Sequence, residues 1–422
     1  MSKEKNSQPA TCMDDYDPNS LSITEAKQRI EAAVTPIKVY DEVAIQHALN
    51  RVLSEPVSST INVPPYTNSA MDGYAIRGTD IPSNGEKRLK IAGVVMAGKP
   101  IQNIIGSNEC TRIMTGAKMP EGTDTVIMQE HVTVQGNDIV IGNQHRPGQN
   151  VRQAGEDITQ GQTVLDKGRR LTAADLGLFA SLGVATVNVV RKVRVAFFST
   201  GDELTQVGSV LKEGQIYDSN RYTLTAMLQR FDAEIIDLGV VKDSQQEVED
   251  AFNRASQQAD VVITTGGVSV GDADYVKETL EKLGQVNFWK ISMKPGRPLA
   301  FGKINNNLIF GLPGNPVSTM VTFYQFVLPA LQTLQGESHR ETLTLKLPCT
   351  TPLRKIAGRV EYQRGIMKKN TAGDLVVKSV GGQGSHLLTS MSKANCFIIL
   401  PMECEHVEAG DIVTVQPFCD LV

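Results

Sequence analysis

The sequence has few of the features that would hold a small fold together or bind zinc. Its six cysteines include no C-x-x-C pair, and its six histidines show no metal-ligand spacing. Scattered cysteines of this kind favour a reducing compartment and argue against a disulfide framework or a zinc site. We therefore expect cysteines with structural roles and a cytoplasmic protein.

Long apolar runs and basic patches are also missing. No stretch reaches the roughly 18 consecutive apolar residues that a membrane-spanning helix needs. The formal net charge is −4, with acidic and basic residues interspersed along the chain. This pattern lacks the electrostatic footprint of a nucleic-acid or membrane-surface binder. We expect neither partner, so any anionic ligand has to be bound by local groups.

Common catalytic signatures are absent as well. The stretch GGVSVG, residues 266–271, is not followed by the Lys-Ser or Lys-Thr of a Walker A loop and does not fit G-x-G-x-x-G. No nucleophile–base pair stands out for serine or cysteine hydrolysis. The chemistry must therefore be sought in other patterns.

Hydrophobic patterning divides the 422 residues into several parts, because the chain is too long for one core. Residues 1–19 lack periodicity and are expected to form a disordered tail. ITEAKQRIEAAV and AIQHALNRVL predict two opening helices, and a further helix is predicted near residue 172. Between about residues 88 and 143, short β-branched runs separated by turn residues predict a β-rich module.

Strand and helix patterns alternate from Val193 onward, which predicts a doubly wound α/β domain with a largely parallel sheet. After Glu341 only short β patterns remain, and these predict a small β-barrel or sandwich. The fold class is thus multidomain, α/β plus β.

Polar residues follow the predicted strands of the α/β segment. The loops concerned contain Gly201-Asp202-Glu203, Asp243, Gly266-Gly267, Lys294-Pro295-Gly296-Arg297-Pro298 and Pro313-Gly314-Asn315-Pro316. The carboxyl ends of parallel strands meet at one edge, where open α/β folds bind ligands. We expect these loops to line one crevice.

Each loop has two interpretations when it is taken alone. The glycines of GGVSVG can simply form a strand-to-helix turn that Asp272 caps, or their amides and the helix N-terminus can bind a phosphate. In one interpretation, the prolines of KPGRP and PGNP have a purely structural role and stiffen the turns. Alternatively, Lys290, Lys294 and Arg297 supply cations for phosphate oxygens.

The acids of this edge pose a problem for an anionic ligand. Glu203, Asp243, Asp272 and Asp274 would share the crevice. A carboxylate about 4 Å from a phosphate oxygen is repelled by roughly 4 kcal/mol at an effective dielectric near 20. A divalent cation removes this conflict, and oxygen ligands suit Mg²⁺. Any single acid can instead be a solvated helix cap.

Two further clusters lie upstream. PPYTNSAMDGYAIRG, residues 64–78, places Asp72-Gly73 in a tight turn, and RQAGEDI, residues 152–158, combines Arg152 with Glu156 and Asp157. A turn cap at Asp72 and a surface ion pair between Arg152 and Glu156 are the structural alternatives.

The motifs occur in one order: PPYTNSAMDGYA, IMTGA, GEDI, STGDEL, IYDSNRY, TTGGVSVGDADYVK, MKPGRP, GLPGNPVSTM and QGSH. This order closely resembles the MoeA family of molybdopterin molybdenumtransferases, which includes the C-terminal part of gephyrin. The resemblance extends from about residue 20 to the end. One departure is Arg297, where the family more often has lysine, so a planar fork replaces a point donor.

The resemblance implies a four-domain protomer after the tail at 1–19. Residues 20–61 and 150–190 would form an elongated, discontinuous domain I, and residues 62–149 the β-rich insertion, domain II. Residues 191–338 would form a MoaB/Mog-like α/β domain III that binds molybdopterin. Residues 339–422 would form the C-terminal β-barrel, domain IV.

The resemblance also implies an activity. Molybdate would be inserted into the dithiolene of adenylylated molybdopterin with Mg²⁺ assistance, releasing AMP and molybdenum cofactor. The protein would be a homodimer whose cleft combines the α/β domain of one subunit with the first two domains of the other. Transient contacts with the adenylyltransferase and with molybdoenzyme maturation proteins are expected.

Site residues are carried over onto matching positions. Glu203, Asp243 and Asp274 would hold the metal, with Asp157 and Asp72 as further catalytic residues. The substrate-binding set is Thr115, Arg152, Thr200, Gly201, Asp218, Ser219, Asn220, Gly266, Gly267, Ser269, Lys290, Lys294, Pro313, Gly314 and Pro316. Two rival functions are an adenylyltransferase, whose domain resembles the α/β segment alone, and a non-catalytic scaffold like gephyrin in receptor clustering.

Overall fold

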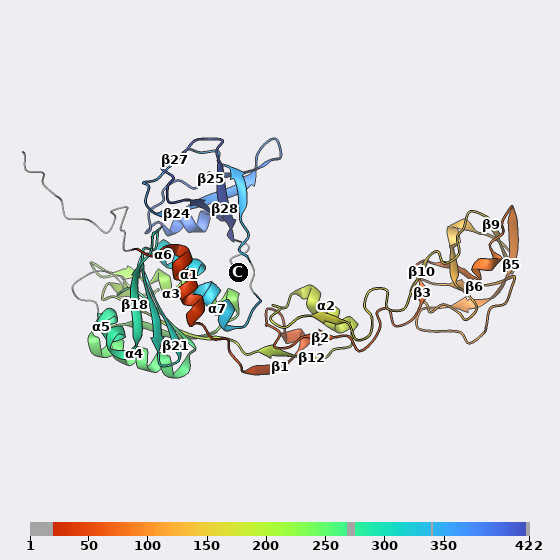
Figure 1. Cartoon of the computed structure of the whole chain (residues 1–422), viewed down its shortest axis with the longest axis horizontal. Helices are drawn as coiled ribbons and strands as arrows, with labels where there is room; N and C mark the ends of the chain where they lie inside the picture. The colour runs from red at the N-terminus through yellow and green to blue at the C-terminus, as the bar shows by residue number, and fades with distance from the viewer. Residues whose placement is uncertain (1–19, 268–274, 339–340, 419–422) are drawn as a thin grey trace, which may run out of the picture. The chain divides into compact units, whose positions relative to one another are not determined.

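The structure is a computed structural model that describes residues 20–267, 275–338 and 341–418 (Figure 1). Contacts divide the chain into two compact units. The larger unit comprises Met1–Asp41, Asn50–Val52 and Val189–Val422, and the smaller unit comprises Glu42–Leu49 and Leu53–Asn188. We describe each unit by itself. Among the described residues, no helix is both long and apolar enough to cross a membrane.

A six-stranded sheet forms the centre of the larger unit. Its spatial order is β16 (Glu234–Val241), β13 (Arg194–Thr200), β17 (Val261–Thr265), β21 (Asn307–Leu312), β20 (Pro298–Ile304) and β18 (Gln285–Lys290). The first four strands are mutually parallel, whereas β20 is antiparallel to both of its neighbours. Hence β18 runs in the same direction as β21. The predicted α/β domain is confirmed, with β20 as an additional hairpin strand.

Helices cover both faces of this sheet (Figure 1). One face packs against α1 (Ile23–Ala33), α3 (Ser219–Phe231), α6 (Pro316–Thr322), the π-helical turn η4 (Phe323–Val327) and α7 (Leu328–Leu334). The other face packs against α4 (Gln245–Gln258) and α5 (Tyr275–Leu283). Side chains alternate along β13 as a strand requires: Phe197 lies in the first core and Phe198 in the second.

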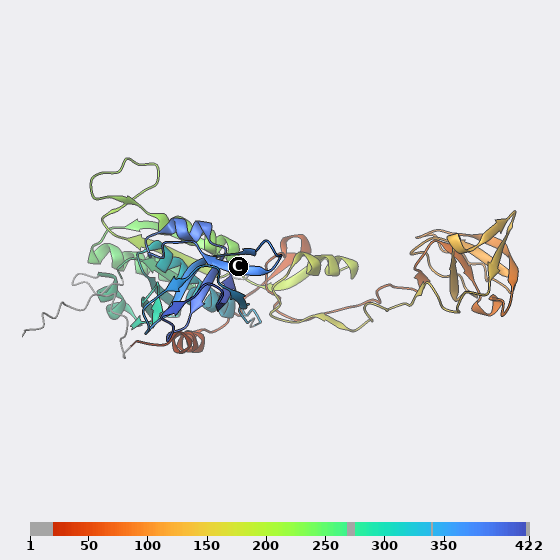
Figure 2. The ribbon, with the colours of Figure 1, turned by 90° about the horizontal axis from the view of Figure 1, so that it is seen from above.

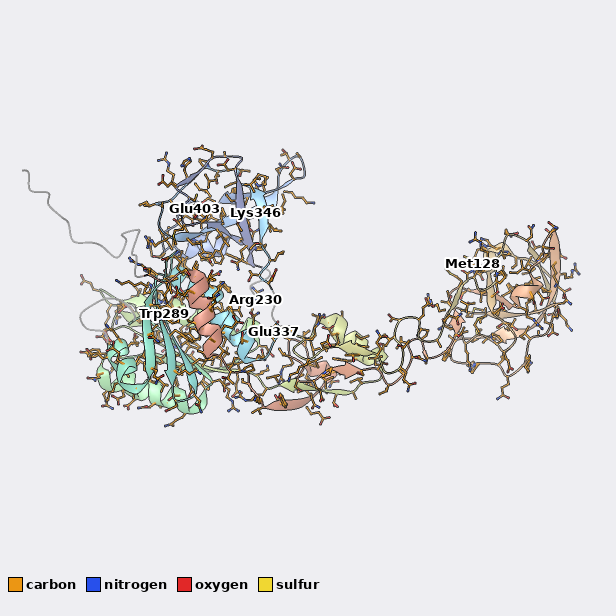
Figure 3. All side chains as sticks on the ribbon, in the orientation of Figure 1. Met128, Arg230, Trp289, Glu337, Lys346 and Glu403 are labelled. Atoms are coloured by element: carbon orange, nitrogen blue, oxygen red, sulfur yellow. The ribbon has the colours of Figure 1, made fainter. Side chains whose placement is uncertain are left out.

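The single tryptophan lies on an edge strand of this sheet. Trp289 of β18 packs against Phe301 with ring centroids 5.4 Å apart (Figure 3). The guanidinium of Arg29, on α1, lies 6.0 Å from its ring centroid. The α1 helix thus belongs to the larger unit, and it buries Ala26 and Ile30 in the first core.

Only one of the two predicted opening helices forms. The α1 helix starts after Ser22, whose hydroxyl accepts a hydrogen bond from the Glu25 amide at 3.1 Å. The second prediction was wrong, because AIQHALNRVL forms only the short 3₁₀ turn η1 (Ile45–His47). Asn50 adopts a left-handed φ of 63°, which breaks the helical repeat, and the following Val52 and Leu53 are fully buried.

A second six-stranded sheet lies in the C-terminal part of the larger unit. It contains β19 (Met293–Lys294), β24 (Val360–Lys369), β26 (Cys396–Leu400), β28 (Ile412–Pro417) and β22 (Leu345–Pro348), with β25 (Leu375–Ser379) paired to β24. A short helix, α8 (Leu388–Lys393), and the pair β23 (Leu353–Arg354) and β27 (His406–Val407) complete it. Strand β19 ends at Lys294, the first residue of the KPGRP segment, so this loop starts in the C-terminal sheet.

The smaller unit contains a third six-stranded sheet. Its order is β7 (Thr125–Met128), β4 (Gly73–Ile76), β6 (Glu109–Ile113), β5 (Glu86–Val95), β9 (Asp138–Gly142) and β8 (Thr133–Gln135). This part, orange in Figure 2, consists almost wholly of strands and loops, as predicted. The predicted helix near residue 172 is α2 (Ala173–Ser181), which begins with a reciprocal capping box between Thr172 and Asp175.

Short two-stranded ladders connect the remaining segments. They pair β1 (Tyr40–Ala44) with β12 (Thr186–Val190), β2 (Val57–Ser58) with β11 (Thr163–Leu165), β3 (Asn68–Ser69) with β10 (Val151–Arg152), and β14 (Leu204–Thr205) with β15 (Ile216–Tyr217). The β3–β10 ladder matters for the site because Arg152 is opposite Asn68.

Candidate functional site

The predicted loops of the α/β segment meet at the carboxyl edge of the sheet. In the strand register Thr265, the last residue of β17, lies beside Ser199 of β13 and beside Leu312, the last residue of β21. Thr200 lies beside Val241, the last residue of β16. The chain leaves this edge into Gly201–Glu203, Asp243, Gly266–Gly267 and Pro313–Pro316. The expected convergence of these loops is therefore present.

Glycine permits the closest of these approaches. Gly266 has a φ of +88°, and a Cβ at this position would lie 2.6 Å from the Thr200 carbonyl oxygen. A Cβ on Gly314 would lie 3.8 Å from the Gly266 Cα. Gly267 also has a positive φ, 63°. The two loops thus present adjacent stretches of bare backbone, which suits close approach of an oxyanion.

The start of α3 adds hydrogen-bond acceptors to this edge. Asn220 donates from Nδ2 to the Gly314 carbonyl at 2.7 Å, and Asp218 caps the helix by accepting from the Arg221 amide at 3.1 Å. Both side chains are buried. Asp218 Oδ2 and Asn220 Oδ1 have no hydrogen-bond partner among the described residues. Ser219, between them, is the first residue of the helix. Buried acceptors usually have a partner in the protein or in ordered water, so these two oxygens can accept a hydrogen bond from a further group.

The PGNP turn is held by its own helix. Pro316 is the first residue of α6, and the Thr319 hydroxyl donates to the Pro313 carbonyl at 2.6 Å. Proline suits the first helical position because its missing N–H has no intrahelical partner there. The turn is therefore rigid where it contacts Gly266.

Three carboxylates gather beside Gly201: Asp202, Glu203 and Asp243. A Cβ on Gly201 would lie 2.6 Å from a Glu203 carboxylate oxygen, and the Asp243 amide donates to Asp202 Oδ1 at 3.4 Å. Desolvation, then the charges of Asp202 and Glu203, raise the pKa of Asp243. Sequence reasoning did not select Asp202, although its position between Gly201 and Glu203 was a usable signal.

These carboxylates suit a divalent cation only in part. Crowded negative charge and hard oxygen donors are what Mg²⁺ binds, and Mg²⁺ keeps several water ligands. However, the described residues contain no preformed group of three or more metal-ligating side chains. The arrangement therefore fits an ion held by one or two carboxylates, with water and substrate oxygens completing its shell. The predicted residues Ser269 and Asp274, and also Asp272, lie outside the described residues.

Two cations near the KPGRP segment lie on different sheets, Lys290 on the central sheet and Lys294 on the C-terminal sheet. Lys290 ends β18, opposite Pro298. Lys294 pairs with Glu361 across β19 and β24, and its Nζ lies 3.6 Å from the buried Glu361 Oε2. The buried Glu361 carboxylate fixes the position of the Lys294 ammonium, and the Lys294 side chain remains half-exposed. A phosphate bound by Lys294 has to compete with this ion pair.

The QGSH motif also reaches this edge. The Val317 amide, in the first turn of α6, donates to the Ser385 carbonyl at 3.1 Å. Behind the motif lies Arg364, which is 1% exposed and donates to Ser390 Oγ at 3.0 Å and to the Gly384 carbonyl at 3.1 Å. Burial lowers the pKa of Arg364 to about 10. Sequence reasoning missed Arg364, although an arginine within the strand pattern VEYQRGIM was a detectable signal.

Asp72 and Thr115 of the smaller unit are in direct contact. The Thr115 amide and hydroxyl donate to Asp72 Oδ1 at 2.7 and 2.8 Å, and these two bonds lower the pKa of Asp72. Arg112 donates to the Gly73 carbonyl at 3.0 Å and lies 5.1 Å from the Tyr74 ring centroid. The turn around Asp72 is thus a fixed acidic position.

The second upstream cluster is built on backbone contacts. Glu156 accepts a hydrogen bond from the Gln153 amide at 2.9 Å, so it closes its own loop. The Asp157 amide donates to the Val63 carbonyl at 3.0 Å. Arg152 is exposed on β10 and is joined through the β3–β10 ladder to the segment that leads to Asp72.

We predict that Thr115→Val raises the pKa of Asp72, because it removes the hydroxyl donor and keeps the amide donor. The folded pKa of Asp72 lies below its unfolded value. Its contribution to stability is therefore present above the unfolded value and is lost as pH falls through the folded value. In the variant the interval between the two pKa values is narrower, so this loss should be smaller and should be complete at higher pH. An NMR titration of the Asp72 carboxyl measures the shift, and Thr115→Ser, which retains the hydroxyl, is the matched control. Equal titration curves for the valine and serine variants would refute the hydrogen-bond assignment.

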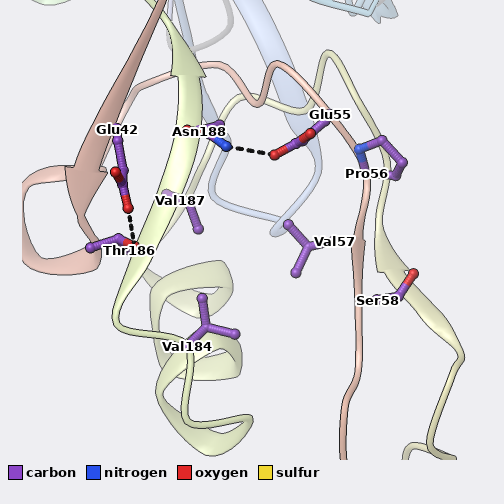
Figure 4. A pocket seen from close by; sticks show the side chains of 9 residues that line it. All are labelled: Glu42, Glu55, Pro56, Val57, Ser58, Val184, Thr186, Val187 and Asn188. Atoms are coloured by element: carbon purple, nitrogen blue, oxygen red, sulfur yellow. Dashed lines mark hydrogen bonds between the residues drawn. The ribbon is translucent and has the colours of Figure 1, made fainter.

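None of the predicted site residues lines the pocket shown in Figure 4, which lies in the smaller unit. Its volume is about 230 Å³. Its two carboxylates already have donors: the Thr186 hydroxyl bonds Glu42 at 2.8 Å, and the Asn188 amide bonds Glu55 at 2.7 Å (Figure 4). This pocket therefore carries no part of the candidate site.

Three family models match the chain. The MoeA N-terminal region (domain I and II) matches residues 21–183. A model described as "Probable molybdopterin binding domain" matches residues 196–333, and the MoeA C-terminal region (domain IV) matches residues 346–418. Together these matches cover most of the chain in the order expected from its motifs.

Similar proteins of known name and structure support this assignment. A molybdopterin molybdenumtransferase of Haemophilus influenzae is 49% identical over 380 residues, which cover 90% of this chain and 94% of that protein. Gephyrin of Dictyostelium discoideum is 37% identical over 88% of this chain, and the match spans 58% of the gephyrin. The crystal structure of the moeA protein of Pyrococcus horikoshii OT3 has a TM-score of 0.83 at 27% identity and covers 94% of this chain and 100% of that one.

The motif order, the three matched regions and the fold agree, and the chain belongs to the MoeA family.

Proposed function

We propose that this chain is a molybdopterin molybdenumtransferase that inserts molybdate into the dithiolene of adenylylated molybdopterin and releases AMP. One observation carries the proposal. In a chain of the MoeA family, the bare backbone of Gly266 and Gly314 lies at the sheet edge that also holds the crowded acids Glu203 and Asp243. Backbone suited to binding a phosphate and acids suited to binding a cation thus lie at the same edge.

The strand-end loops would bind and orient the substrate. The amides of Gly266 and Gly267, together with Ser269, Lys290 and Lys294, would hold the phosphoanhydride. The surface beneath the phosphoanhydride would be formed by Thr200, Gly201, Pro313, Gly314 and Pro316. The unpartnered oxygens of Asp218 and Asn220 would accept N–H or O–H groups of the bound molecule, and Ser219 would present the helix start.

Mg²⁺ would be held by Glu203, Asp243 and Asp274. When bound, this ion would neutralise part of the negative charge of the phosphates. The acids would also orient a water for cleavage of the phosphoanhydride. No protein nucleophile is required, because the substrate's dithiolene sulfurs replace molybdate oxygens, which leave as water with the thiol protons. Hydrolysis of the phosphoanhydride gives AMP and leaves the other phosphate on the pterin product. Molybdate and the pterin end of the substrate would be bound by Asp72, Thr115, Arg152 and Asp157.

We further propose a homodimer in which the α/β loops of one copy and the Asp72–Thr115 set of the other serve the same reaction. A surface for association is available in the β14–β15 region. Val210 is 90% exposed, and Ile216, Tyr217 and Tyr222 nearby are also exposed. Exposed apolar groups concentrated in one segment are typical of association surfaces. The four-domain division, a cytoplasmic location and transient contacts with the adenylyltransferase and maturation proteins belong to the same proposal.

Mixing two inactive variants tests the shared site. Glu203→Gln and Asp72→Asn should each be inactive alone. If subunits exchange at random, half of the dimers are mixed, and each mixed dimer has one intact site, so about a quarter of wild-type activity should return. A mixture of Glu203→Gln with Asp243→Asn, both from the α/β set, is the control and should recover nothing. No recovery in the first mixture, with exchange shown by differently tagged subunits, would exclude the shared site.

The main rival is the adenylyltransferase reaction, since the α/β segment alone has the features of such a domain. The two activities differ in what they consume and release. The purified protein should release AMP from adenylylated molybdopterin when molybdate and Mg²⁺ are present, and it should not consume ATP with molybdopterin. Consumption of ATP without AMP release would favour the rival. Absence of both reactions in a folded dimer would favour the scaffold role.

A further inference from the structure

A hollow of the larger unit lies at the edge of its central sheet opposite the candidate active site. It has a volume of about 350 Å³, and four of the residues that line it are cations, Arg51, Arg191, Lys192 and Arg194. Strand β13 begins at Arg194 and β16 begins at Glu234, which also lines the hollow. The hollow is therefore at the amino ends of the parallel strands, whereas the candidate active site is at their carboxyl ends.

Arg51 has an unusual environment. Only 6% of this residue is exposed, and its Nη2 donates to Asp41 Oδ2 at 2.6 Å and to the Val190 carbonyl at 3.0 Å. Its Nε, however, is buried and has no hydrogen-bond partner among the described residues. A buried N–H of a charged group without an acceptor is unfavourable. Because Nε has almost no accessible surface, an acceptor oxygen of a ligand in the hollow reaches it only when the Arg51 side chain shifts toward the hollow.

The other three cations differ in how many of their N–H donors remain available for a ligand. Both Nη atoms of Arg191 donate to Asp260, at 2.7 and 2.6 Å, so the Arg191 side chain is held in a fixed position in the lining of the hollow. Lys192 pairs with Asp232, and Arg194 pairs with Glu234 at 3.3 Å. An ammonium has three donors and a guanidinium five, so one acid does not use either fully. The Lys192 and Arg194 side chains are 39% and 47% exposed and can turn toward a ligand.

We propose that this hollow is an anion-binding site for a small phosphate-bearing molecule, separate from the active site. The phosphate would accept hydrogen bonds from Lys192 and Arg194, and from Arg51 Nε once the Arg51 side chain shifts toward it. The hollow is of the size of small-molecule pockets, which begin at about 300 Å³. The acids at its rim do not block it, because the Asp41 and Glu234 side chains are 47% and 55% exposed and can turn to water. The strand that starts at this site, β13, ends at Thr200 in the active site.

Calorimetric titration of the full-length protein with pyrophosphate, at low salt and without Mg²⁺, tests the proposal. Ala233 also lines the hollow, and Ala233→Glu fills it with a carboxylate while every ion pair is kept. The titration should show two saturable sites. Ala233→Glu and Arg51→Gln should each weaken one of them about ten-fold or more, because they add a like charge or remove a charged donor.

Lys294→Gln is the matched control at the active site and should weaken only the other binding event. If Arg51→Gln fails to fold, Ala233→Glu still decides, because Ala233 is only half-buried. Unchanged pyrophosphate binding by folded Ala233→Glu, or a single site that is lost in Lys294→Gln alone, would overturn the proposal. Since the two sites are measured by binding, failure of the proposed reaction would leave this outcome unaffected.

Discussion

Gly266→Ala is expected to lower the free energy of unfolding by about 2–4 kcal/mol, and to remove most of the AMP-releasing activity. The added Cβ would lie 2.6 Å from the Thr200 carbonyl oxygen, and the backbone at Gly266 has a φ of +88°, which side-chain-bearing residues rarely adopt. Thr200 is the last residue of β13, so its carbonyl cannot easily move away. The loop must shift, and the amides proposed to hold the phosphate shift with it.

Two alanine variants separate the possible causes. Gly208→Ala introduces a side chain at a φ of +92° with no atom within 4 Å, so it measures backbone strain alone. Gly314→Ala adds a Cβ at van der Waals distance, 3.8 Å from the Gly266 Cα. It should therefore reduce the space between the two loops with little loss in the free energy of unfolding. Urea denaturation and an AMP-release assay give both readouts. If Gly266→Ala loses no more stability than Gly208→Ala, the close contact with Thr200 is not the cause.

Glu203→Gln is expected to lower the rate of AMP release roughly 100-fold or more, as the loss of a preorganised charge at a reacting phosphate commonly does. The same change should make the unliganded protein slightly more stable. Desolvation and the charges of Asp202 and Glu203 raise the folded pKa of Asp243. The ionised form of Asp243 is therefore disfavoured in the folded state. The resulting destabilisation develops as pH rises from the unfolded pKa to the folded pKa, and it persists above that range.

Removing the Glu203 charge should relieve part of this destabilisation, by less than about 1 kcal/mol because these groups are solvent-screened. Thermal unfolding at neutral pH measures it. Glu403→Gln, an exposed acid in the turn between β26 and β27, is the matched control and should change neither stability nor activity. A Glu203→Gln variant that is fully active would remove this residue from the proposed metal set.

The sequence was sufficient to predict the α/β core because apolar runs, turns and helical periods alternate from Val193 onward. It also predicted that the loops after β13, β17 and β21 meet, since parallel strands end at the same edge. It could not predict the hairpin strand β20, because PLAFGKI has no period that distinguishes an antiparallel insertion from a buried parallel strand. It overpredicted a helix over AIQHALNRVL, residues 44–53, which form only the 3₁₀ turn Ile45–His47, because the left-handed Asn50 and tertiary burial of Leu53 override the local pattern.

The details of the site depend on contacts between distant segments. Nothing in the local sequence shows that Gly266 approaches the Thr200 carbonyl, that Lys294 pairs with Glu361, or that the QGSH motif contacts the first turn of α6. The resemblance supplied residue names, and the structure supplies the reasons why some of them are placed together. The roles of the predicted site residues remain proposals.

The central claim is that AMP release is coupled to molybdate insertion at the carboxyl edge of the sheet. A single-turnover experiment tests it most directly: excess protein is mixed with adenylylated molybdopterin and Mg²⁺, and AMP is measured as molybdate is titrated in. We predict that AMP release is negligible without molybdate and rises to one AMP for each molybdenum cofactor formed. AMP release at the same rate without molybdate, or cofactor formation without AMP, would contradict the account.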